Sequence, residues 1–141
     1  MCGINGFLGF ESDDLISKMN LSISHRGPDS SGFFTSPLSK VSLGHVRLSI
    51  IDLSPESNQP LFTTCKRFSL VFNGEIYNYR ELKASLEAKG EVFSSNGDGE
   101  VLLRMWQVYG KSCLSSLDGI FSAKSLRLIK TIKINKQLIK L

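Results

Sequence analysis

The stretch FSLVFNGEIYNYREL, residues 68–82, predicts a buried strand, a turn and the start of a helix in direct succession. Its first part, Phe68–Phe72, is apolar except for Ser69, as expected for a strand covered on both faces. The Asn-Gly pair that follows is typical of a turn that ends a strand. Asn78 has a glutamate three residues later, the spacing of a capping box at a helix N-terminus. We therefore expect a sheet layer and a helical layer to meet at this stretch.

Strands dominate the chain on the N-terminal side of this stretch, and helices follow it. Apolar runs predict strands at residues 4–10, 32–35 and 41–51. Helical spacing of apolar residues predicts helices from Ser12 to Ile23, from Asn78 to Gly90, and from Val101 to Gly110. Strands and helices alternate only loosely, which favours an α+β layered domain over a parallel doubly wound sheet.

The charge of the chain is distributed unevenly. The 141 residues suffice for one domain, and the formal net charge is +4. Six of the 17 Lys and Arg residues lie in residues 124–141, whereas all 13 Asp and Glu residues precede this segment. The basic character therefore belongs to the C-terminal segment, and we expect no nucleic-acid partner.

The segment 124–141 differs in composition from the rest of the chain. It is rich in Lys, Ile and Leu, and its apolar residues fit neither a clean strand nor a clean helix. One reading is a basic amphipathic or membrane-surface segment. We prefer a poorly ordered end that belongs to no core, and we place the boundary of the folded domain at residues 1–123.

The sequence is not that of a membrane-spanning protein or of a disulfide-rich one. No run of about 18 apolar residues is present, which excludes a membrane-spanning helix, and the N-terminus lacks the pattern of a secretory signal. Cys2, Cys65 and Cys113 are odd in number and far apart, so they fit neither a disulfide framework nor a zinc site. These features predict a cytoplasmic location.

Cys2 is a candidate nucleophile because of its place behind the start methionine. If Met1 is removed, Cys2 carries a free α-amino group with a reference pKa of about 8 beside its own thiol. The amine can accept the thiol proton, so that nucleophile and base belong to one residue. Gly3 leaves the backbone free to approach a substrate.

Three further positions carry polar groups suited to a binding site. Arg47 lies in a mostly apolar strand, where it would bind a carboxylate, form an internal ion pair or face the surface. Asn73 and Gly74 offer a side-chain amide and a backbone N–H, the donors of an oxyanion hole, or form a simple turn. Asp98 precedes a helix, where it would cap the helix or hold a substrate ammonium.

Taken together, these segments resemble one family. The motifs are MCGI at residues 1–4, HRGPD at 25–29, RLSIID at 47–52, QPL at 59–61, NGEIYNYREL at 73–82 and DGEVLL at 98–103. In this order and spacing they are similar to the class II glutamine amidotransferase domain of glutamine-hydrolysing asparagine synthetases. The resemblance covers residues 1 to about 123.

The resemblance implies a fold and a reaction. The fold is an αββα sandwich of antiparallel sheets of the N-terminal-nucleophile hydrolase type, here incomplete at the C-terminus. Cys2 would attack the side-chain amide of glutamine, form a thioester and release ammonia, and Arg26 and Asp29 would brace the site. The implied glutamine contacts and oxyanion donors are Arg47, Leu48, Ser49, Ile50, Ile51, Asn73, Gly74, Glu75 and Asp98.

The family pattern breaks after Ala123, and the synthetase half that would follow is missing. No metal or cofactor is implied for the glutaminase reaction, whereas ATP and Mg²⁺ are implied for the synthetase half, with aspartate as the ammonia acceptor. Three hypotheses follow: an active glutaminase fragment, an inactive remnant of a truncated or frameshifted gene, or a docking module that passes ammonia to a separate synthetase chain.

Overall fold

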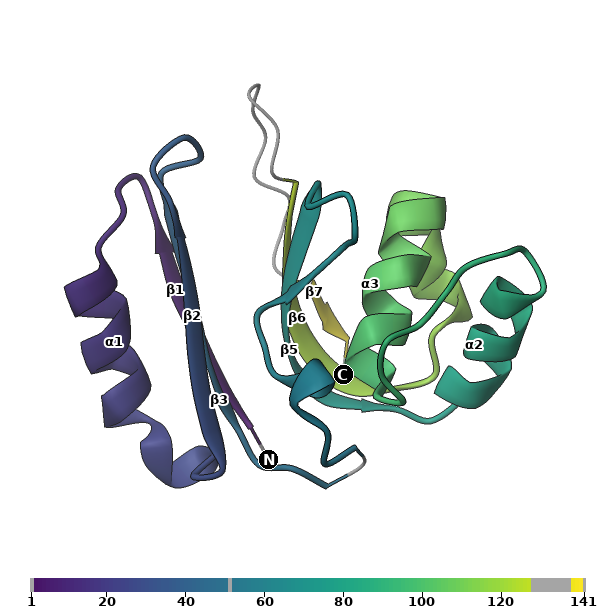
Figure 1. The fold of residues 1–141 in the computed structure, drawn as a ribbon, viewed down its shortest axis with the longest axis horizontal. Helices are drawn as coiled ribbons and strands as arrows, with labels where there is room; N and C mark the ends of the chain where they lie inside the picture. Colours follow the sequence, from purple (N-terminus) through teal and green to yellow (C-terminus); the bar gives the residue numbers. More distant parts are fainter. Residues whose placement is uncertain (1, 51, 128–137, 141) are drawn as a thin grey trace.

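The computed structural model describes residues 2–50, 52–127 and 138–140. Two antiparallel sheets lie face to face, and each carries helices on its outer face (Figure 1). The sheets have the strand orders β1-β3-β2 and β4-β5-β6-β7. The α+β class and the αββα arrangement predicted from the sequence are confirmed.

The N-terminal half consists of the three-stranded sheet and α1. Its elements are β1 (Gly3–Leu8), α1 (Asp13–Ser22), the short 3-10 helix η1 (Ser24–Arg26), β2 (Ser30–Ser36) and β3 (Val41–Arg47). The predicted N-cap is confirmed, because the Ser12 hydroxyl accepts a 3.1 Å hydrogen bond from the N–H of Leu15. The central strand β3 pairs with β1 from Gly3↔Val46 onward and with β2 from Ser30↔Arg47 onward. The start of β1 and the end of β3 therefore lie side by side.

Polar groups join α1 to its sheet. Asn20, only 3% exposed, accepts a 2.8 Å hydrogen bond from the side chain of Asn5. Its own amide donates to the Ser31 hydroxyl at 3.1 Å and to the carbonyl of Gly32 at 2.9 Å. A Cβ on Gly44 would lie 2.3 Å from the oxygens of both asparagines, so only glycine fits beneath this pair.

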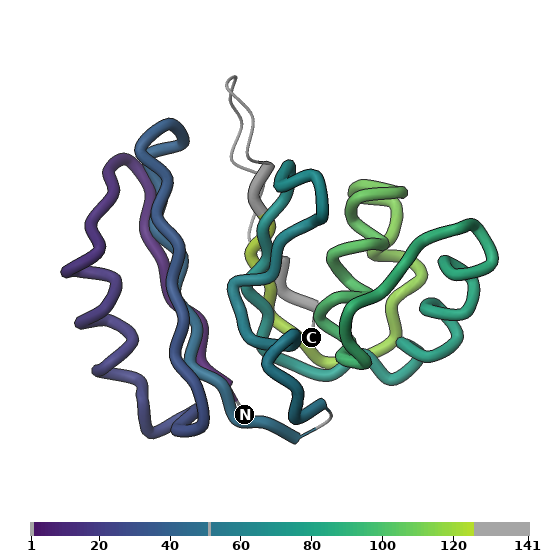
Figure 2. Tube along the Cα trace, in the orientation of Figure 1, coloured from purple at the N-terminus to yellow at the C-terminus, as the bar shows by residue number. Residues whose placement is uncertain are grey.

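The C-terminal half consists of the four-stranded sheet with α2 and α3. Its elements are the 3-10 helix η2 (Pro55–Ser57), β4 (Leu61–Phe62), β5 (Phe68–Ile76), α2 (Tyr79–Glu87), α3 (Asp98–Tyr109), the 3-10 helix η3 (Gly110–Ser116), β6 (Gly119–Arg127) and β7 (Leu138–Lys140). α3 packs on the outer face of this sheet and α2 packs against α3, as the chain trace also shows (Figure 2). An apolar core fills the space between helices and sheet, built from Leu61, Leu70, Phe72, Ile76, Leu102, Leu103, Leu117, Phe121 and Ala123.

Three expectations about local structure are corrected. The capping box at Asn78 is absent: its amide donates to the carbonyl of Ser116 and accepts from the N–H of Asp118, so the side chain ties α2 to a distant segment. The strand expected over residues 41–51 ends at Arg47, because the chain turns there into the loop before η2. The turn expected at Asn73-Gly74 is also absent, because β6 pairs with β5 along its whole length and the strand continues past Phe72 to Ile76.

Strand structure also extends into the segment 124–141. The pairing of β5 with β6 runs from Ile76↔Gly119 to Phe68↔Arg127, and β7 pairs with β6 over Leu138–Lys140. Backbone pairing of this kind does not require an alternating side-chain pattern, which explains why the sequence showed no clean strand. Residues 128–137 and 141 lie outside the described residues, and the domain boundary at residue 123 stays a prediction.

Candidate functional site

A cavity of about 260 Å³ opens where the two halves meet, and it brings together candidate residues from four separate elements. Its lining includes Cys2, Arg47, Asn73, Gly74, Glu75 and Asp98. These come from the segment before β1, the end of β3, the second half of β5 and the first turn of α3. The N-terminus lies at the end of the gap between the sheets (Figure 1).

Four consecutive residues after β3 were also predicted to contact a ligand. Leu48 and Ile50 line the cavity. Ser49 is not among the lining residues, and its N–H donates instead to the carboxylate of Asp29 at 2.7 Å. Ile51 lies outside the described residues.

The Cys2 thiol is half-buried and held by the chain that follows β3. The N–H of Leu48 points at the sulfur at 3.3 Å, and the carbonyl of the same residue lies 3.6 Å from it. Arg26 donates from Nε to the carbonyl of Cys2 at 3.2 Å. Arg26 and Asp29 thus contact the two segments that carry the cavity lining, as the bracing role expected for them requires.

Arg47 presents a buried cation to the cavity. It is 7% exposed, and its guanidinium donates to the carbonyls of Ser54 (2.9 Å) and Asp52 and to the side chain of Asn58 (2.7 Å). No ion pair of Arg47 occurs within residues 2–50, 52–127 and 138–140. Two of its three alternatives, an internal ion pair and a surface position, therefore do not hold in the described chain. A buried guanidinium that only neutral groups contact favours an anionic ligand.

Asp52 is a site residue to which sequence reasoning assigned no role. Its carboxylate accepts from the N–H of Ser54 (2.8 Å), the hydroxyl of Ser57 (2.8 Å) and the N–H of Asn96 (2.7 Å). Partial burial alone would raise the pKa of Asp52, but these hydrogen bonds hold it well below its usual range. An acid at the start of a Ser- and Pro-containing loop is a turn signal that could have indicated the contact with Ser54. The contact with Asn96 joins the two halves of the molecule.

Asn73 and Gly74 lie on β5 with donors available to a ligand. The side-chain amide of Asn73 lines the cavity and has no hydrogen-bond partner among the residues described. Gly74 has φ +154°, and a Cβ there would lie 2.3 Å from the carbonyl oxygen of Ile120 and 2.4 Å from Cα of Phe121. Glycine is therefore required for β6 to approach β5 at this point.

Asp98 is buried at the N-terminus of α3. It is 7% exposed, and its Oδ2 accepts a 3.0 Å hydrogen bond from the N–H of Ile76. Burial raises the pKa of Asp98, hydrogen bonds from backbone N–H groups oppose this, and the neighbouring Glu75 raises the pKa further. The residue before the helix is Gly97, so Asp98 is the first helical residue and not the N-cap. Its carboxylate faces the cavity as a candidate partner for a cation.

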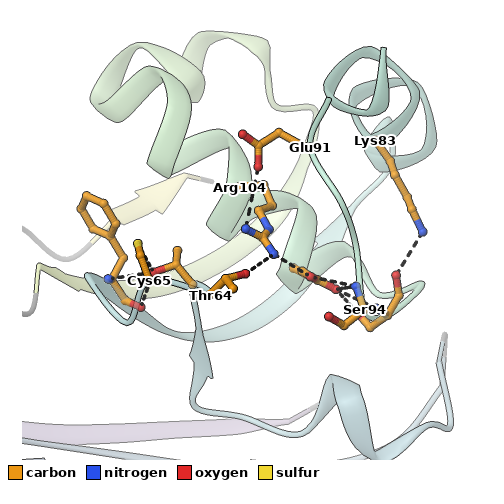
Figure 3. A network of polar contacts seen from close by, with 10 residues as sticks. Thr64, Cys65, Lys83, Glu91, Ser94 and Arg104 are labelled. Carbon is orange, nitrogen blue, oxygen red and sulfur yellow. Dashed lines mark hydrogen bonds and ion pairs between the residues drawn. The ribbon is translucent and has the colours of Figure 1, made fainter. Parts of the chain in front are cut away.

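A second network, around Glu100, supports the loop that leads to Asp98. The Glu100 carboxylate accepts from the N–H groups of Ser94 and Ser95 and from the Ser95 hydroxyl at 2.7–3.1 Å. Arg104 lies 3.6 Å from Glu100 and 3.7 Å from Glu91, and it donates to the Thr64 hydroxyl at 3.3 Å. Figure 3 shows the guanidinium between Glu91, Thr64 and the loop at Ser94. Sequence reasoning placed Glu100 in the DGEVLL motif and gave it no role, because its partners Ser94 and Ser95 lie in a loop of irregular sequence.

The cavity therefore offers a thiol, an amide and a backbone donor, a cation and an anion. The cation and the anion suit the two charged ends of a zwitterion, and the donors beside the thiol suit a carbonyl oxygen that becomes negative on nucleophilic attack. Within the described residues, no group of three or more His, Cys, Asp or Glu is arranged to hold a metal ion. No helix in that part of the chain is long and apolar enough to span a membrane.

Comparison with known proteins identifies the family to which the chain is similar. A family model described as a glutamine amidotransferase domain matches residues 1–126. Asparagine synthetase [glutamine-hydrolyzing] 1 of Bacillus subtilis is 42% identical over 129 residues, covering 86% of this chain and 20% of that protein. A putative asparagine synthetase [glutamine-hydrolyzing] 2 of Methanocaldococcus jannaschii is 36% identical over 141 residues, covering 86% of this chain and 27% of its own length.

A solved structure shows the same fold. Glutamine phosphoribosylpyrophosphate amidotransferase from B. subtilis superposes with a TM-score of 0.73 at 24% identity, covering 88% of this chain and 35% of that one. This chain thus spans roughly a fifth to a third of the lengths of these proteins.

Proposed function

The chain belongs to the family of glutamine amidotransferase domains, and we propose that it hydrolyses the side-chain amide of glutamine as the glutaminase half of an asparagine synthetase. The observation that carries the proposal is the shared cavity of Cys2, Arg47, Asn73, Gly74 and Asp98. These residues are far apart in the sequence, and each supplies a group that glutamine hydrolysis requires.

Substrate binding uses the two charged residues of the cavity. The α-carboxylate of glutamine binds Arg47, three of whose five N–H donors bond to partners among the described residues. The α-ammonium binds Asp98, with Glu75 beside it. Leu48 and Ile50 line the wall between them, and we assign Ser49 and Ile51 to the same wall by family resemblance. This arrangement presents the side-chain amide to Cys2.

The chemical step begins at the Cys2 sulfur. After removal of Met1, the α-amino group of Cys2 takes the thiol proton and the sulfur attacks the amide carbon. The resulting oxyanion accepts hydrogen bonds from the Asn73 amide and the Gly74 N–H. The carbon–nitrogen bond then breaks, the leaving nitrogen takes the proton and departs as ammonia, and a thioester remains. Water attacks the thioester and releases glutamate and the free thiol.

The ammonia acceptor lies outside this chain. We propose that a synthetase domain or a separate synthetase chain receives the ammonia and transfers it to aspartate, using ATP and Mg²⁺ bound there. Ile50, Tyr77 and Ile120 line the cavity and are 59–66% exposed, which gives its mouth an apolar rim suited to such a partner. No nucleic-acid partner and no membrane partner are proposed. A cytoplasmic location would keep the Cys2 thiol reduced.

The test is glutamate release from glutamine by the purified chain, with Cys2→Ala as the control. We expect turnover in the wild type, none in Cys2→Ala, and an intact mass one methionine below the encoded value. A wild type that is as inactive as Cys2→Ala would contradict the proposal and favour the inactive remnant. Activity that appears only with an added synthetase chain would favour the docking module.

A further inference from the structure

We propose that Gln59 is a positioning residue that sets the geometry of the oxyanion donors on β5, an inference that rests on the proposed glutaminase function. Gln59 lines the cavity, but its side chain is turned to the backbone of Phe72, the residue before Asn73. Its Nε2 donates to the carbonyl of Phe72 at 3.1 Å, and its Oε1 accepts from the N–H of Phe72 at 2.6 Å. Both polar groups of the Gln59 amide therefore bond to the backbone of Phe72.

The register explains why this side chain substitutes for a strand. β4 pairs with β5 through Leu61↔Leu70 and Phe62↔Ser69, so a continued β4 would bring residue 59 opposite Phe72. β4 begins only at Leu61, and the Gln59 side chain occupies the place of its backbone. A primary amide has a donor and an acceptor like a peptide group, so the ladder extends by one residue without a strand.

Gln59 is itself fixed from the other half of the molecule. A Cβ on Gly32 of β2 would lie 2.1 Å from the Gln59 carbonyl oxygen, so β2 packs directly against this backbone. His45 of β3, 1% exposed, also lies close to the Phe72 backbone. Burial lowers the pKa of His45 to about 4, with a smaller contribution from Arg47, so the ring is neutral at pH 7. Gln59 is thus packed against β2 of one sheet while its side chain bonds to β5 of the other.

The consequence reaches Asn73 and Gly74 through the alternation of an antiparallel strand. The N–H and C=O of Phe72 face Gln59, so those of Asn73 face β6 and the N–H of Gly74 returns to the cavity side. On the β6 side, Gly74 is fixed by its contact with Ile120 and Phe121. Gln59 restrains β5 from the side opposite β6. It does so at Phe72, one residue before the oxyanion donors Asn73 and Gly74.

The experiment compares Gln59→Met with Gln107→Met in the full chain. Both substitutions exchange an amide for an apolar group of similar length. Gln107 lies on α3, is absent from the cavity lining, and has a buried Oε1 with no partner in the described part of the chain. We expect Gln59→Met to lower kcat by about 10- to 100-fold, the effect of displacing a reacting geometry by up to about 1 Å. KM for glutamine should stay within about twofold, because Arg47 and Asp98 are untouched.

A second variant distinguishes an effect on kcat from a loss of folding. Gln59→Glu keeps the shape of the side chain and the acceptor for the Phe72 N–H, but at neutral pH it lacks the donor to the Phe72 carbonyl. It should also lower kcat without raising KM, with a melting temperature near that of the wild type. If Gln59→Glu retains wild-type kcat, or if Gln107→Met loses as much, the inference is overturned while glutamine hydrolysis by the wild type still supports the proposed function. A wild type without glutamate release overturns both.

Discussion

The two halves of the molecule are held together by different chemistry. In the N-terminal half, α1 buries only Ile16 and Asn20, and the asparagine makes its contacts with the sheet through hydrogen bonds. In the C-terminal half, α3 buries an unbroken run from Asp98 to Trp106, and its apolar members pack on β5 and β6. The first interface depends on hydrogen bonds between polar side chains, whereas the second depends on apolar area removed from water.

The candidate site lies across the boundary between these halves. The N-terminal half supplies the thiol and the cation, and the C-terminal half supplies the oxyanion donors and the anion. Asp52, in the loop that connects the halves, bonds to Asn96 of the C-terminal half, and Gln59, between η2 and β4, bonds to Phe72 of β5. This division means that substitutions in each half should have distinguishable effects on chemistry, binding and stability.

The largest effect on chemistry from the C-terminal half is expected for Asn73→Ala. Its side-chain amide has no partner among the described residues, so its removal costs little stability and takes away one oxyanion donor. We expect kcat to fall by about 10²- to 10³-fold, with KM for glutamine nearly unchanged. Steady-state glutamate release measures both. Asn96→Ala is a matched control, because that exposed side chain contacts Lys83 and does not line the cavity. A large rise in KM for Asn73→Ala would assign the residue to substrate binding.

The second prediction concerns the apolar packing of the same half. Leu102 is 2% exposed in the core between α3 and the sheet, and Leu102→Ala removes apolar area and leaves a cavity. The free energy of unfolding should fall by about 3 kcal/mol, measured by urea denaturation. Val108→Ala on the same helix, where the side chain is 43% exposed, should cost far less. Equal losses for the two variants would contradict an apolar core at this interface.

The third prediction tests the cation of the N-terminal half. Arg47→Lys retains the charge but loses the planar fork that contacts Ser54, Asn58 and Asp52 while facing the cavity. KM for glutamine should rise by about 10- to 100-fold, the cost of one to two charge-assisted hydrogen bonds. Arg80→Lys, on the surface of α2, is the control. An unchanged KM would remove Arg47 from the carboxylate site.

Sequence reasoning identified the parts of the molecule whose signals are local. The N-cap at Ser12, the end of α3 at Gly110 and the first half of β5 follow from the residues within each segment, whereas α3 begins at Asp98 and not at Val101. The position of Cys2 behind the start methionine, and Arg47 in an apolar run, marked two cavity residues for the same reason. Each of these patterns has a physical cause within a few residues.

The parts that sequence reasoning missed depend on which segments meet. Asn78 has the local pattern of a cap but bonds to residues 116 and 118, since η3 passes beside it in the fold. The contact of Gln59 with Phe72 depends on where β4 ends, and that of Asp52 with Asn96 on how the halves are joined. No local sequence pattern encodes which segments meet in the fold. Gln59 and Asp52 could therefore be placed in motifs, but no role could be assigned to them.

The fourth prediction tests the polar interface of α1. Asn20, 3% exposed, is lost in Asn20→Ala, which leaves the Asn5 amide without its acceptor and the Gly32 carbonyl without this donor. The free energy of unfolding should fall by about 2 kcal/mol, the cost of unpaired buried polar groups. Ser22→Ala, on the same helix but exposed, is the control. If Asn20→Ala is no more costly than Ser22→Ala, the contrast between the two halves fails.

The smallest effect is expected from pH, through Asp98. Glutamine's ammonium requires an ionised carboxylate, and the pKa of Asp98 is raised by burial and by Glu75 despite hydrogen bonds from backbone N–H groups. Asp98 therefore takes up its proton at a higher pH than an ordinary aspartate, so KM should rise as pH falls towards that raised pKa and stay constant above it. Asp98→Asn can still accept from the Ile76 N–H, and its KM should be higher at neutral pH and lose this dependence. A pH profile of KM, from neutral pH down to the lowest pH at which the protein stays folded, measures the effect. If KM depends on pH in the same way for the wild type and Asp98→Asn, Asp98 does not bind the ammonium. Glu75 of β5 would then be the anionic residue that binds it.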